Sequence, residues 1–321
     1  MSFRRIGILT SGGDAPGMNA AIRSATRYAL SCNLEVIGIF RGFLGLINEE
    51  MKVFDHRSVS NIISHGGTIL KTARCPEFLE EDTQRRAVGI IKKYGIDGLV
   101  LIGGNGTYQA GIALSRKWGI PCIGVPGTID NDINGTDETI GADTAVNTAL
   151  EAIDKIRDTV TSMERIFVVE VMGRDSGFIA LQVGLASGAE EVIIPERNYD
   201  IHRMCHDIVE GNLRGKISWI IIVAEGAGSA EKIAAQITEI TSLETRVAVL
   251  GHVQRGGSPT AKDRNLATRL GAYAVELLIQ GATAKAVGVQ SNQLTAVDLE
   301  FAVSKKNVDC DVFLQLIKKL T

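Results

Sequence analysis

Cysteine is scarce in this 321-residue sequence, and its five copies lie far apart with no C-x-x-C pair. That spacing excludes the common structural zinc sites, and the odd number argues against a disulfide framework. Because free cysteine is usually buried, we expect reduced and mostly buried thiols.

Long apolar runs and an excess of one charge are missing as well. No apolar stretch reaches the roughly 18 residues of a membrane span, and the run within Met1–Thr10 is too short for a signal peptide. The formal net charge is −3, so no global field favours nucleic acid or an anionic membrane. We expect a cytoplasmic protein without either partner, in which local arginines and backbone N–H groups hold any anionic ligand.

The composition is that of an ordinary globular protein, with 45% hydrophobic and 22% charged residues. Short apolar, β-branched runs alternate with helical patterns, which is typical of parallel α/β layers. The sequence therefore predicts an α/β fold of two Rossmann-like, three-layer lobes with mostly parallel sheets and a cleft between them. The expected strands are 5–10, 34–40, 98–102, 122–125, 166–171, 191–194, 219–224 and 246–250, and the expected helices include 17–31, 81–94, 108–118, 144–159 and 263–280.

The unusual residues follow these strands directly. Ligands of open parallel sheets bind at the carboxyl ends of the strands, so the coincidence predicts one composite site. The segments concerned are Gly12–Asn19, Gly103–Thr107, Pro126–Asp132, Met172–Ser176, Glu225 and Gly251–Ser258.

Two of these segments are rich in glycine. Thr10–Asn19 joins the first strand to its helix, and paired glycines let backbone N–H groups approach a phosphate. It is not a Walker A loop, and the alternative is a tight turn capped by Asp14 or Asn19. The second, Ile102–Thr107, lacks the G-x-G-x-x-G spacing of a dinucleotide site.

A pair of carboxylates lies in Pro126–Asp132. Asp130 and Asp132 are two residues apart, so both would face the same way in an extended segment. One can accept a proton from an attacking hydroxyl while the other holds a cation. The alternative is a plain turn.

Arginines lie at either end of several strands: Arg174 follows one, Arg165 precedes one and Arg246 begins one. The planar guanidinium suits phosphate, although a single arginine is usually a solvated surface residue. His252 shares one motif with an arginine, whereas His202 and His206 lack a third ligand and are better explained as a helix-surface pair. The arginines are Arg74, Arg165, Arg174, Arg246 and Arg255.

Together these motifs resemble the bacterial ATP-dependent 6-phosphofructokinases, over about Ile6 to Gln293. The matching loops are Thr10–Asn19, Pro126–Asp132, Val169–Arg174 and Leu250–Pro259. The resemblance implies conversion of ATP and fructose 6-phosphate to ADP and fructose 1,6-bisphosphate, with Mg²⁺, by a homotetramer. It also implies a nucleotide-binding lobe of residues 1–141 with 254–304 and a sugar-phosphate-binding lobe of 142–253 with 305–321.

Residue roles follow from the same resemblance. Asp130 would be the base, with Thr128 beside it, Arg74 and Arg174 neutralising developing charge, and Gly13 supplying a backbone N–H. Asn105 and Asp132 would hold the metal. Nucleotide contacts would be Gly13, Phe43, Arg74, Cys75, Gly103, Gly104, Asn105, Gly106 and Thr107. Substrate contacts would be Thr128, Asp130, Asp132, Met172, Gly173, Arg174, Glu225, His252 and Arg255, with Arg165 and Arg246 from a neighbouring subunit.

The resemblance further implies ADP as activator and phosphoenolpyruvate as inhibitor. The matching positions form a basic cluster, although Asn61 and His65 stand where relatives often carry Asp and Arg. These positions are Arg23, Arg27, Arg157, Glu190, Arg214 and Lys216.

Asn105 is the most informative departure, because the family usually has a metal-holding Asp there. Gly106 and Gly127 favour ATP, since pyrophosphate-using relatives carry Asp and Lys at these positions. A pyrophosphate-dependent enzyme and a sugar-phosphate or nucleotide sensor without turnover remain as alternatives. A doubly wound dehydrogenase ranks lowest, because Gly12–Gly17 lacks its glycine spacing.

Overall fold

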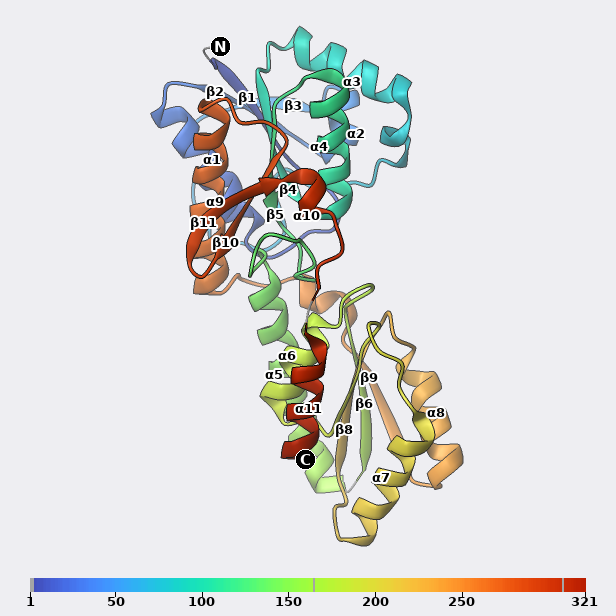
Figure 1. Ribbon diagram of the computed structural model, residues 1–321. Coiled ribbons are helices and arrows are strands. Elements are labelled where there is room, and N and C mark those ends of the chain that lie inside the picture. Colours follow the sequence, from blue (N-terminus) through green and yellow to red (C-terminus); the bar gives the residue numbers. More distant parts are fainter. Residues whose placement is uncertain (1–2, 164, 308) are drawn as a thin grey trace. The chain divides into compact units, whose positions relative to one another are not determined.

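The computed structural model describes residues 3–163, 165–307 and 309–321. The chain divides into a larger unit, Met1–Thr144 with Arg255–Lys306, and a smaller unit, Ala145–Gln254 with Asn307–Thr321 (Figure 1). Both are layered α/β units with mostly parallel sheets, which confirms the predicted fold class. Which ligand each lobe binds stays a prediction.

The larger unit is built on a seven-stranded sheet in the order β11-β10-β5-β4-β1-β2-β3. Only the edge pairs β2–β3 and β10–β11 are antiparallel. The central strands are buried on both faces, which explains their nearly continuous apolar sequences. The strands are β1 Arg5–Thr10, β2 Glu35–Ile39, β3 Met51–Phe54, β4 Gly98–Gly103, β5 Cys122–Pro126, β10 Lys285–Gln290 and β11 Gln293–Asp298.

Helices cover both faces of this sheet. α1 and α9 pack against each other, while α2 and α3 pack together and α4 packs on α10 (Figure 1). Alternate strand residues such as Leu9, Ile39 and Leu101 join α3 and α4 in one hydrophobic core. The helices are α1 Met18–Ser31, α2 Gly42–Ile47, α3 Glu81–Lys93, α4 Asn105–Trp118, α9 Ala261–Ile279 and α10 Leu299–Ala302, with a 3₁₀ turn, η1, at Pro76–Leu79.

The smaller unit holds an all-parallel sheet in the order β7-β8-β6-β9. Its core joins β6, β7 and β8 to α7 and α8, and α6 packs on α11. Its strands are β6 Ile166–Val171, β7 Glu191–Ile193, β8 Trp219–Ala224 and β9 Thr245–Val249. Its helices are α5 Ala142–Met163, which begins in the larger unit, α6 Phe178–Ser187, α7 Ile201–Leu213, α8 Ala230–Thr241 and α11 Cys310–Leu320, with a 3₁₀ turn, η2, at Gly251–Arg255.

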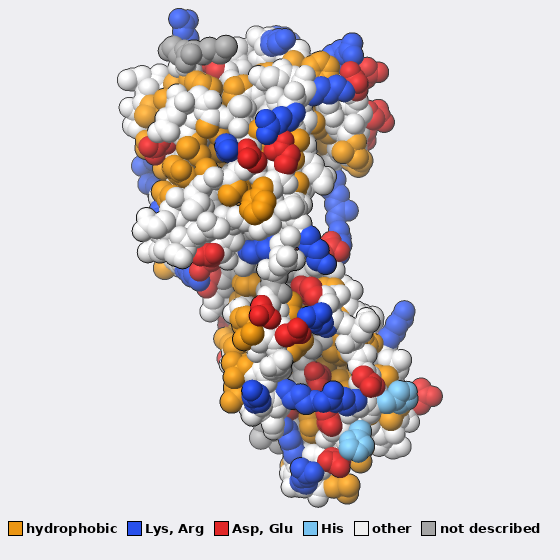
Figure 2. Space-filling view, in the orientation of Figure 1, with side chains coloured by type: hydrophobic (Ala, Val, Ile, Leu, Met, Phe, Trp, Pro, Cys, Tyr) orange, Lys and Arg blue, Asp and Glu red, His pale blue; other side chains and the backbone are white. Residues whose placement is uncertain are grey.

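Two general properties of the chain bear on its ligands. Over the described ranges, no helix combines the length and apolar character required to cross a membrane. Basic and acidic side chains are interspersed on the face shown in Figure 2, as the small net charge suggests. Specific binding of an anion must therefore come from local geometry.

The strand order places the expected ligand site in the larger unit. From β1 the chain moves to β2 on one side, and later to β4 and β5 on the other side. The carboxyl ends of β1 and β4 therefore flank a topological switch point, which is where open α/β sheets bind ligands.

Candidate active site

The first glycine-rich loop follows β1 at this switch point. Ser11 N donates to Ile102 O at 3.1 Å, which ties the loop to β4, and Gly12 takes a left-handed φ of 87°. A Cβ on Gly13 would lie 2.6 Å from Nη1 of Arg255, whose guanidinium donates to Asp14 O at 3.0 Å. Glycine at position 13 thus lets an arginine approach an exposed stretch of backbone.

The second glycine-rich segment is not the turn that the sequence predicted. α4 begins at Asn105, three residues before the expected start, so Asn105–Thr107 form its first turn. Gly104 precedes the helix without a side-chain cap, which leaves N–H groups of the first turn available to a ligand. A helix N-terminus with free N–H groups favours a phosphate.

The loop is held to the first one by close contacts. Thr107 Oγ1 donates to Ser11 O at 3.0 Å, and a Cβ on Gly103 would come within 2.5 Å of that same oxygen. Gly106 is exposed, and a Cβ there would meet no atom within 4 Å. Gly103 is therefore required by packing, whereas Gly106 leaves open space at the helix end.

Gly127 differs from Gly106 in this respect. A Cβ on Gly127 would lie 2.9 Å from Met18 Cε and 3.2 Å from Ile102 Cγ2. The nearer of these atoms is the end of a flexible side chain, so packing disfavours a larger residue at position 127 without excluding it.

The carboxylate segment after β5 is bent, which contradicts the extended conformation assumed from the sequence. Thr128 Oγ1 accepts from Asp130 N at 3.3 Å, and Asn131 takes a left-handed φ of 48°. Thr139 Oγ1 donates to Thr128 O at 2.7 Å and braces the bend. Asp130 and Asp132 are thus separated by a turn rather than by one strand repeat.

Asn105 and Asp132, the two predicted metal ligands, do lie together. Asn105 Nδ2 donates to Asp132 Oδ2 at 2.7 Å. Asn105 Oδ1 is buried and has no hydrogen-bond partner among the described residues. The fully buried Tyr108 lies near this pair, and burial followed by the charge of Asp132 raises the pKa of its hydroxyl well above the usual value.

The remaining predicted nucleotide contacts lie beyond the β1 loop. The Phe43 ring is only 3% exposed and packs on Phe78 with centroids 4.4 Å apart. Cys75 packs against the same core, and burial raises the pKa of its thiol. Arg74 is exposed, and Thr72 Oγ1 near it donates to Gly12 O at 2.5 Å, which ties its segment to the first loop.

In the smaller unit, the ends of β6 and β8 bring another set of predicted residues together. Glu225 N donates to Val171 O at 2.9 Å, and Gly226 N donates to Gly173 O at 3.0 Å. Gly173 has a φ of 139°, in the region that favours glycine. These bonds place Met172 and Arg174 next to Glu225, with the charged side chains of both Arg174 and Glu225 exposed.

Gln254 is a residue that the sequence patterns did not single out. It is fully buried, accepts from Met172 N at 3.3 Å and donates to Gly251 O at 3.0 Å. It therefore joins the end of β6 to η2, which carries the exposed His252.

Arg165 and Arg246 are brought together by a shared acidic partner. Arg165 Nε lies 3.0 Å from Glu244, and Arg246 pairs with the other carboxylate oxygen of Glu244. β9 is an edge strand that ends at the exposed Val249, and the exposed Val253 lies in the η2 turn that follows. This edge combines apolar and basic side chains.

The predicted effector residues of the smaller unit meet at the start of β7 and the end of α7. Glu190 accepts from Ile220 N at 2.7 Å and pairs with Lys216 at 3.3 Å. Arg157 donates to Gly188 O at 2.9 Å, while Arg214 pairs with Glu210. The other two predicted residues, Arg23 and Arg27, lie on α1 in the larger unit.

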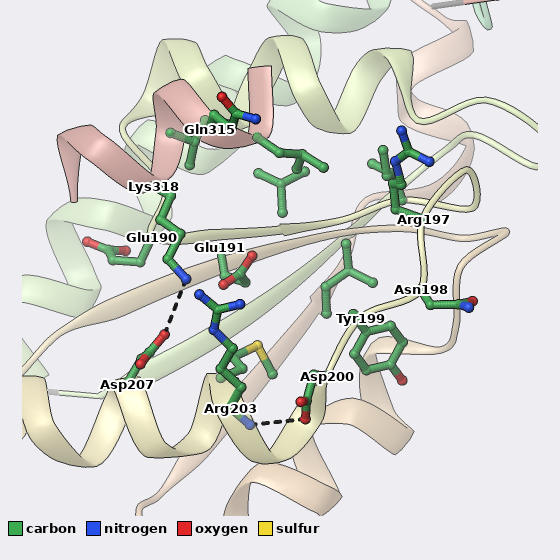
Figure 3. Close-up of a pocket in the computed structure, with 16 residues that line it drawn as sticks. Glu190, Glu191, Arg197, Asn198, Tyr199, Asp200, Arg203, Asp207, Gln315 and Lys318 are labelled. Carbon is green, nitrogen blue, oxygen red and sulfur yellow. Dashed lines mark hydrogen bonds and ion pairs between the residues drawn. The ribbon is translucent and has the colours of Figure 1, made fainter. Parts of the chain in front are cut away.

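A pocket of about 300 Å³ lies nearby between β7, α7 and α11 (Figure 3). No sequence pattern indicated it, because its residues come from three distant segments. Charges of both signs line it, and Lys318 lies 3.8 Å from Asp207. Its lining therefore combines acidic and basic side chains. The labelled polar residues include Glu190, Glu191, Arg203, Asp207, Gln315 and Lys318.

Comparison with known proteins identifies the family. The phosphofructokinase family model matches residues 5–278. The ATP-dependent 6-phosphofructokinases of Bacillus mycoides and Bacillus subtilis are 55% and 54% identical over 320 residues, which is 99% of this chain and 100% of theirs.

Solved structures show the same fold. Phosphofructokinase from Saccharomyces cerevisiae superposes with a TM-score of 0.87 at 34% identity, over 94% of this chain and only 45% of the yeast chain. A pyrophosphate-dependent phosphofructokinase from Marinobacter aquaeolei gives 0.83 at 22% identity, over 98% and 91% of the two chains. From the family match and the identity to its bacterial relatives along its whole length, the chain belongs to the phosphofructokinase family.

Proposed function

We propose that the chain transfers the γ-phosphoryl group of ATP to fructose 6-phosphate, giving ADP and fructose 1,6-bisphosphate. This is a phosphotransferase step of glycolysis, and it takes place in the cytoplasm. One observation carries the proposal most directly: an exposed glycine loop, an uncapped helix N-terminus and a turn with two carboxylates converge at the carboxyl ends of β1, β4 and β5.

The nucleotide phosphates bind to the larger unit in this proposal. Backbone N–H groups of the Gly12–Gly13 loop and of the first turn of α4 face the same switch point and carry partial positive charge. Arg74 supplies further positive charge, and the open space at Gly106 accommodates the nucleotide's α-phosphate. Gly103, Gly104 and Thr107 complete the contacts, with Phe43 and Cys75 beside the nucleotide.

Asp130 acts as the general base. Its carboxylate takes the proton of the sugar 1-hydroxyl as that oxygen bonds to the γ-phosphorus and the bond to ADP breaks. Thr128 holds the turn through the bond to Asp130 N. Gly13 N–H, Arg74 and Arg174 neutralise charge on the transferring group, since phosphoryl transfer depends on positioning and electrostatic stabilisation.

The pair Asn105 and Asp132 fits a magnesium ion. The buried Asn105 Oδ1 without a partner, next to a carboxylate, supplies the oxygen donors that Mg²⁺ prefers. Sites of this kind commonly use one or two protein ligands together with substrate phosphates. When bound, the ion would neutralise phosphate charge, and Asn105 and Asp132 would fix its position.

The sugar phosphate binds to Met172, Gly173, Arg174, Glu225 and His252 of the smaller unit and to Arg255. Arg165 and Arg246 serve the active site of a neighbouring subunit in a homotetramer. The apolar and basic edge at β9 supports this assignment, because an exposed edge strand invites pairing with another chain. ADP and phosphoenolpyruvate act at Arg23, Arg27, Arg157, Glu190, Arg214 and Lys216.

A coupled assay of fructose 1,6-bisphosphate formation tests the function, run in parallel with ATP–Mg²⁺ and pyrophosphate–Mg²⁺. We expect turnover with ATP alone. Turnover with pyrophosphate would overturn the donor assignment. Silence with both donors, together with binding of ATP or sugar phosphate by calorimetry, would favour a sensor without catalysis.

A further inference from the structure

Asn131, between the two carboxylates, has a left-handed backbone conformation. Its φ is 48°, and its side chain is only 8% exposed. Asparagine adopts left-handed backbone more readily than other residues with a Cβ, and contacts around it can fix it in this conformation. The direction in which Asp130 and Asp132 leave the turn depends on this residue, because a change in its φ would rotate one relative to the other.

Lys306 supplies the contacts that hold the turn. Its Nζ donates to Asn131 O at 3.0 Å and to Thr136 O at 2.8 Å, and it lies 3.4 Å from Asn131 Oδ1. Asn131 Nδ2 in turn donates to Asp137 O at 3.0 Å. The ammonium group therefore bridges the two ends of the segment from Asn131 to Thr136.

The charge of Lys306 is also placed where it acts on the site. The side chain is half-buried, and burial lowers the pKa of its ammonium, while the nearby carboxylates of Asp132 and Asp137 raise it. Asp132, the carboxylate that pairs with Asn105, is thus one of the charges that act on the Lys306 ammonium. Its backbone acceptors fix the ammonium in place, so this positive charge is preorganised.

We propose that Lys306 is a positioning residue for phosphoryl transfer, which holds Asn131 in its left-handed conformation and thereby fixes the directions of Asp130 and Asp132. The proposal rests on the proposed function of those carboxylates. Lys306 need not touch either substrate, because it acts through the backbone of the turn. It is also the last residue of the larger unit before the chain crosses at Asn307.

Kinetics of Lys306→Met test the proposal, with Lys305→Met as the matched control. Lys305 is the adjacent lysine and is exposed. We expect Lys306→Met to lower kcat by roughly 10- to 100-fold, the scale of small displacements of catalytic groups, with both KM values changed less than about threefold. Lys305→Met should leave kcat unchanged, and Lys306→Arg should restore part of the loss because arginine also donates to carbonyl groups. Wild-type kcat in Lys306→Met would overturn the proposal.

Two further measurements separate this proposal from the proposed function. In Lys306→Met, amide hydrogen exchange should accelerate in peptides covering 128–137 and remain unchanged elsewhere. Unchanged exchange in those peptides would show that Lys306 does not hold the turn, whatever the activity of the variant. Glycine tolerates positive φ, so Lys306→Met should cost less in kcat on an Asn131→Gly background than on the wild type. Equal costs on both backgrounds would also overturn the proposal. Faster exchange in Lys306→Met, together with a wild-type protein that shows no turnover, would locate the failure in the proposed function and not in the role of Lys306.

Discussion

At the scale of single residues, Asp130 is the group whose chemistry is tested most simply. Asp130→Ser removes the proton acceptor but keeps a small polar side chain in the bend after β5. We expect kcat to fall by about 10²–10⁴-fold, the usual contribution of a general base, with little change in KM for either substrate. Steady-state kinetics against Asp82→Ser, an exposed position on α3, provides the check. A loss of less than threefold would remove Asp130 from this role.

The side chain of Asn105 affects how stable the proposed metal site is when no cation is bound. Its amide nitrogen donates to Asp132 Oδ2, so a hydrogen bond joins the pair in the absence of a cation, although Asn105 Oδ1 is left without a partner in the described part of the chain. Asn105→Asp would replace that donor by a second carboxylate, and like charges at short distance repel. We expect a lower Tm without Mg²⁺ and a larger rise in Tm on adding it, with roughly tenfold tighter Mg²⁺ binding because ligand charge sets affinity.

The measurement for Asn105→Asp is a titration of Tm with Mg²⁺, which needs no turnover. Asn212→Asp, at an exposed position, controls for the added charge. Equal Mg²⁺ responses in wild type and Asn105→Asp would show that this pair does not hold the ion.

Among the secondary-structure elements, α4 is the one at whose N-terminus helix stability and phosphate binding have opposite requirements. A carboxylate in the first turn of a helix stabilises it, whereas the same carboxylate repels a bound phosphate. Gly106→Asp should therefore fold as well as the wild type but raise KM for ATP about tenfold or more, which corresponds to about 1.4 kcal/mol. Gly106→Ala is the matched control, because a Cβ at this position meets open space. An unchanged KM in Gly106→Asp would place the phosphates elsewhere.

The sequence predicted the strands that carry the site because they are continuously apolar. β1, β6 and β8 have the expected bounds, since strands buried on both faces require such residues. β3, β10 and β11 were not expected. β3 and β11 are the edge strands, and polar residues such as Lys52 and Thr295 interrupt their apolar sequences, whereas β10 is buried over Ala286–Val289 but has only a short apolar run.

Local patterns also failed where distant contacts set the backbone. α4 begins with Asn-Gly, a poor helix-forming pair, but the packing of Thr107 and Tyr108 starts the helix earlier than propensity suggests. The bend at Asn131 depends on Lys306, which is 175 residues away in the chain. No spacing rule connects such residues, so the identity of the candidate site was predictable but its internal bracing was not.

For the whole molecule, the points where the chain passes from one unit to the other share a feature. Thr144 N donates to the buried Asp263 at 2.8 Å, Gln254 holds Met172, and Lys306 holds Asn131. Each of these three is the last residue of a unit segment, and each is anchored within its own unit. Each passage of the chain between the units therefore starts at a residue that a hydrogen bond holds within its own unit.

Glu191 links the pocket of Figure 3 to the stability of the whole protein. Burial raises the pKa of its carboxyl above the value of 4.5, against the opposing effects of the Val192 backbone, Lys318 and Arg203, while Asp207 adds to the rise. The folded protein therefore binds the proton more tightly than the unfolded chain, so this group's contribution to the free energy of unfolding is lost as pH rises through the folded pKa.

Glu191→Gln removes this titrating carboxyl group, and at pH 7.5 it should unfold at a higher temperature than the wild type. The difference should shrink as the pH falls toward 4.5, and thermal unfolding at several pH values, with the exposed Glu239→Gln as control, measures it. A difference that stays constant with pH would show that the charged carboxylate is not penalised in this pocket.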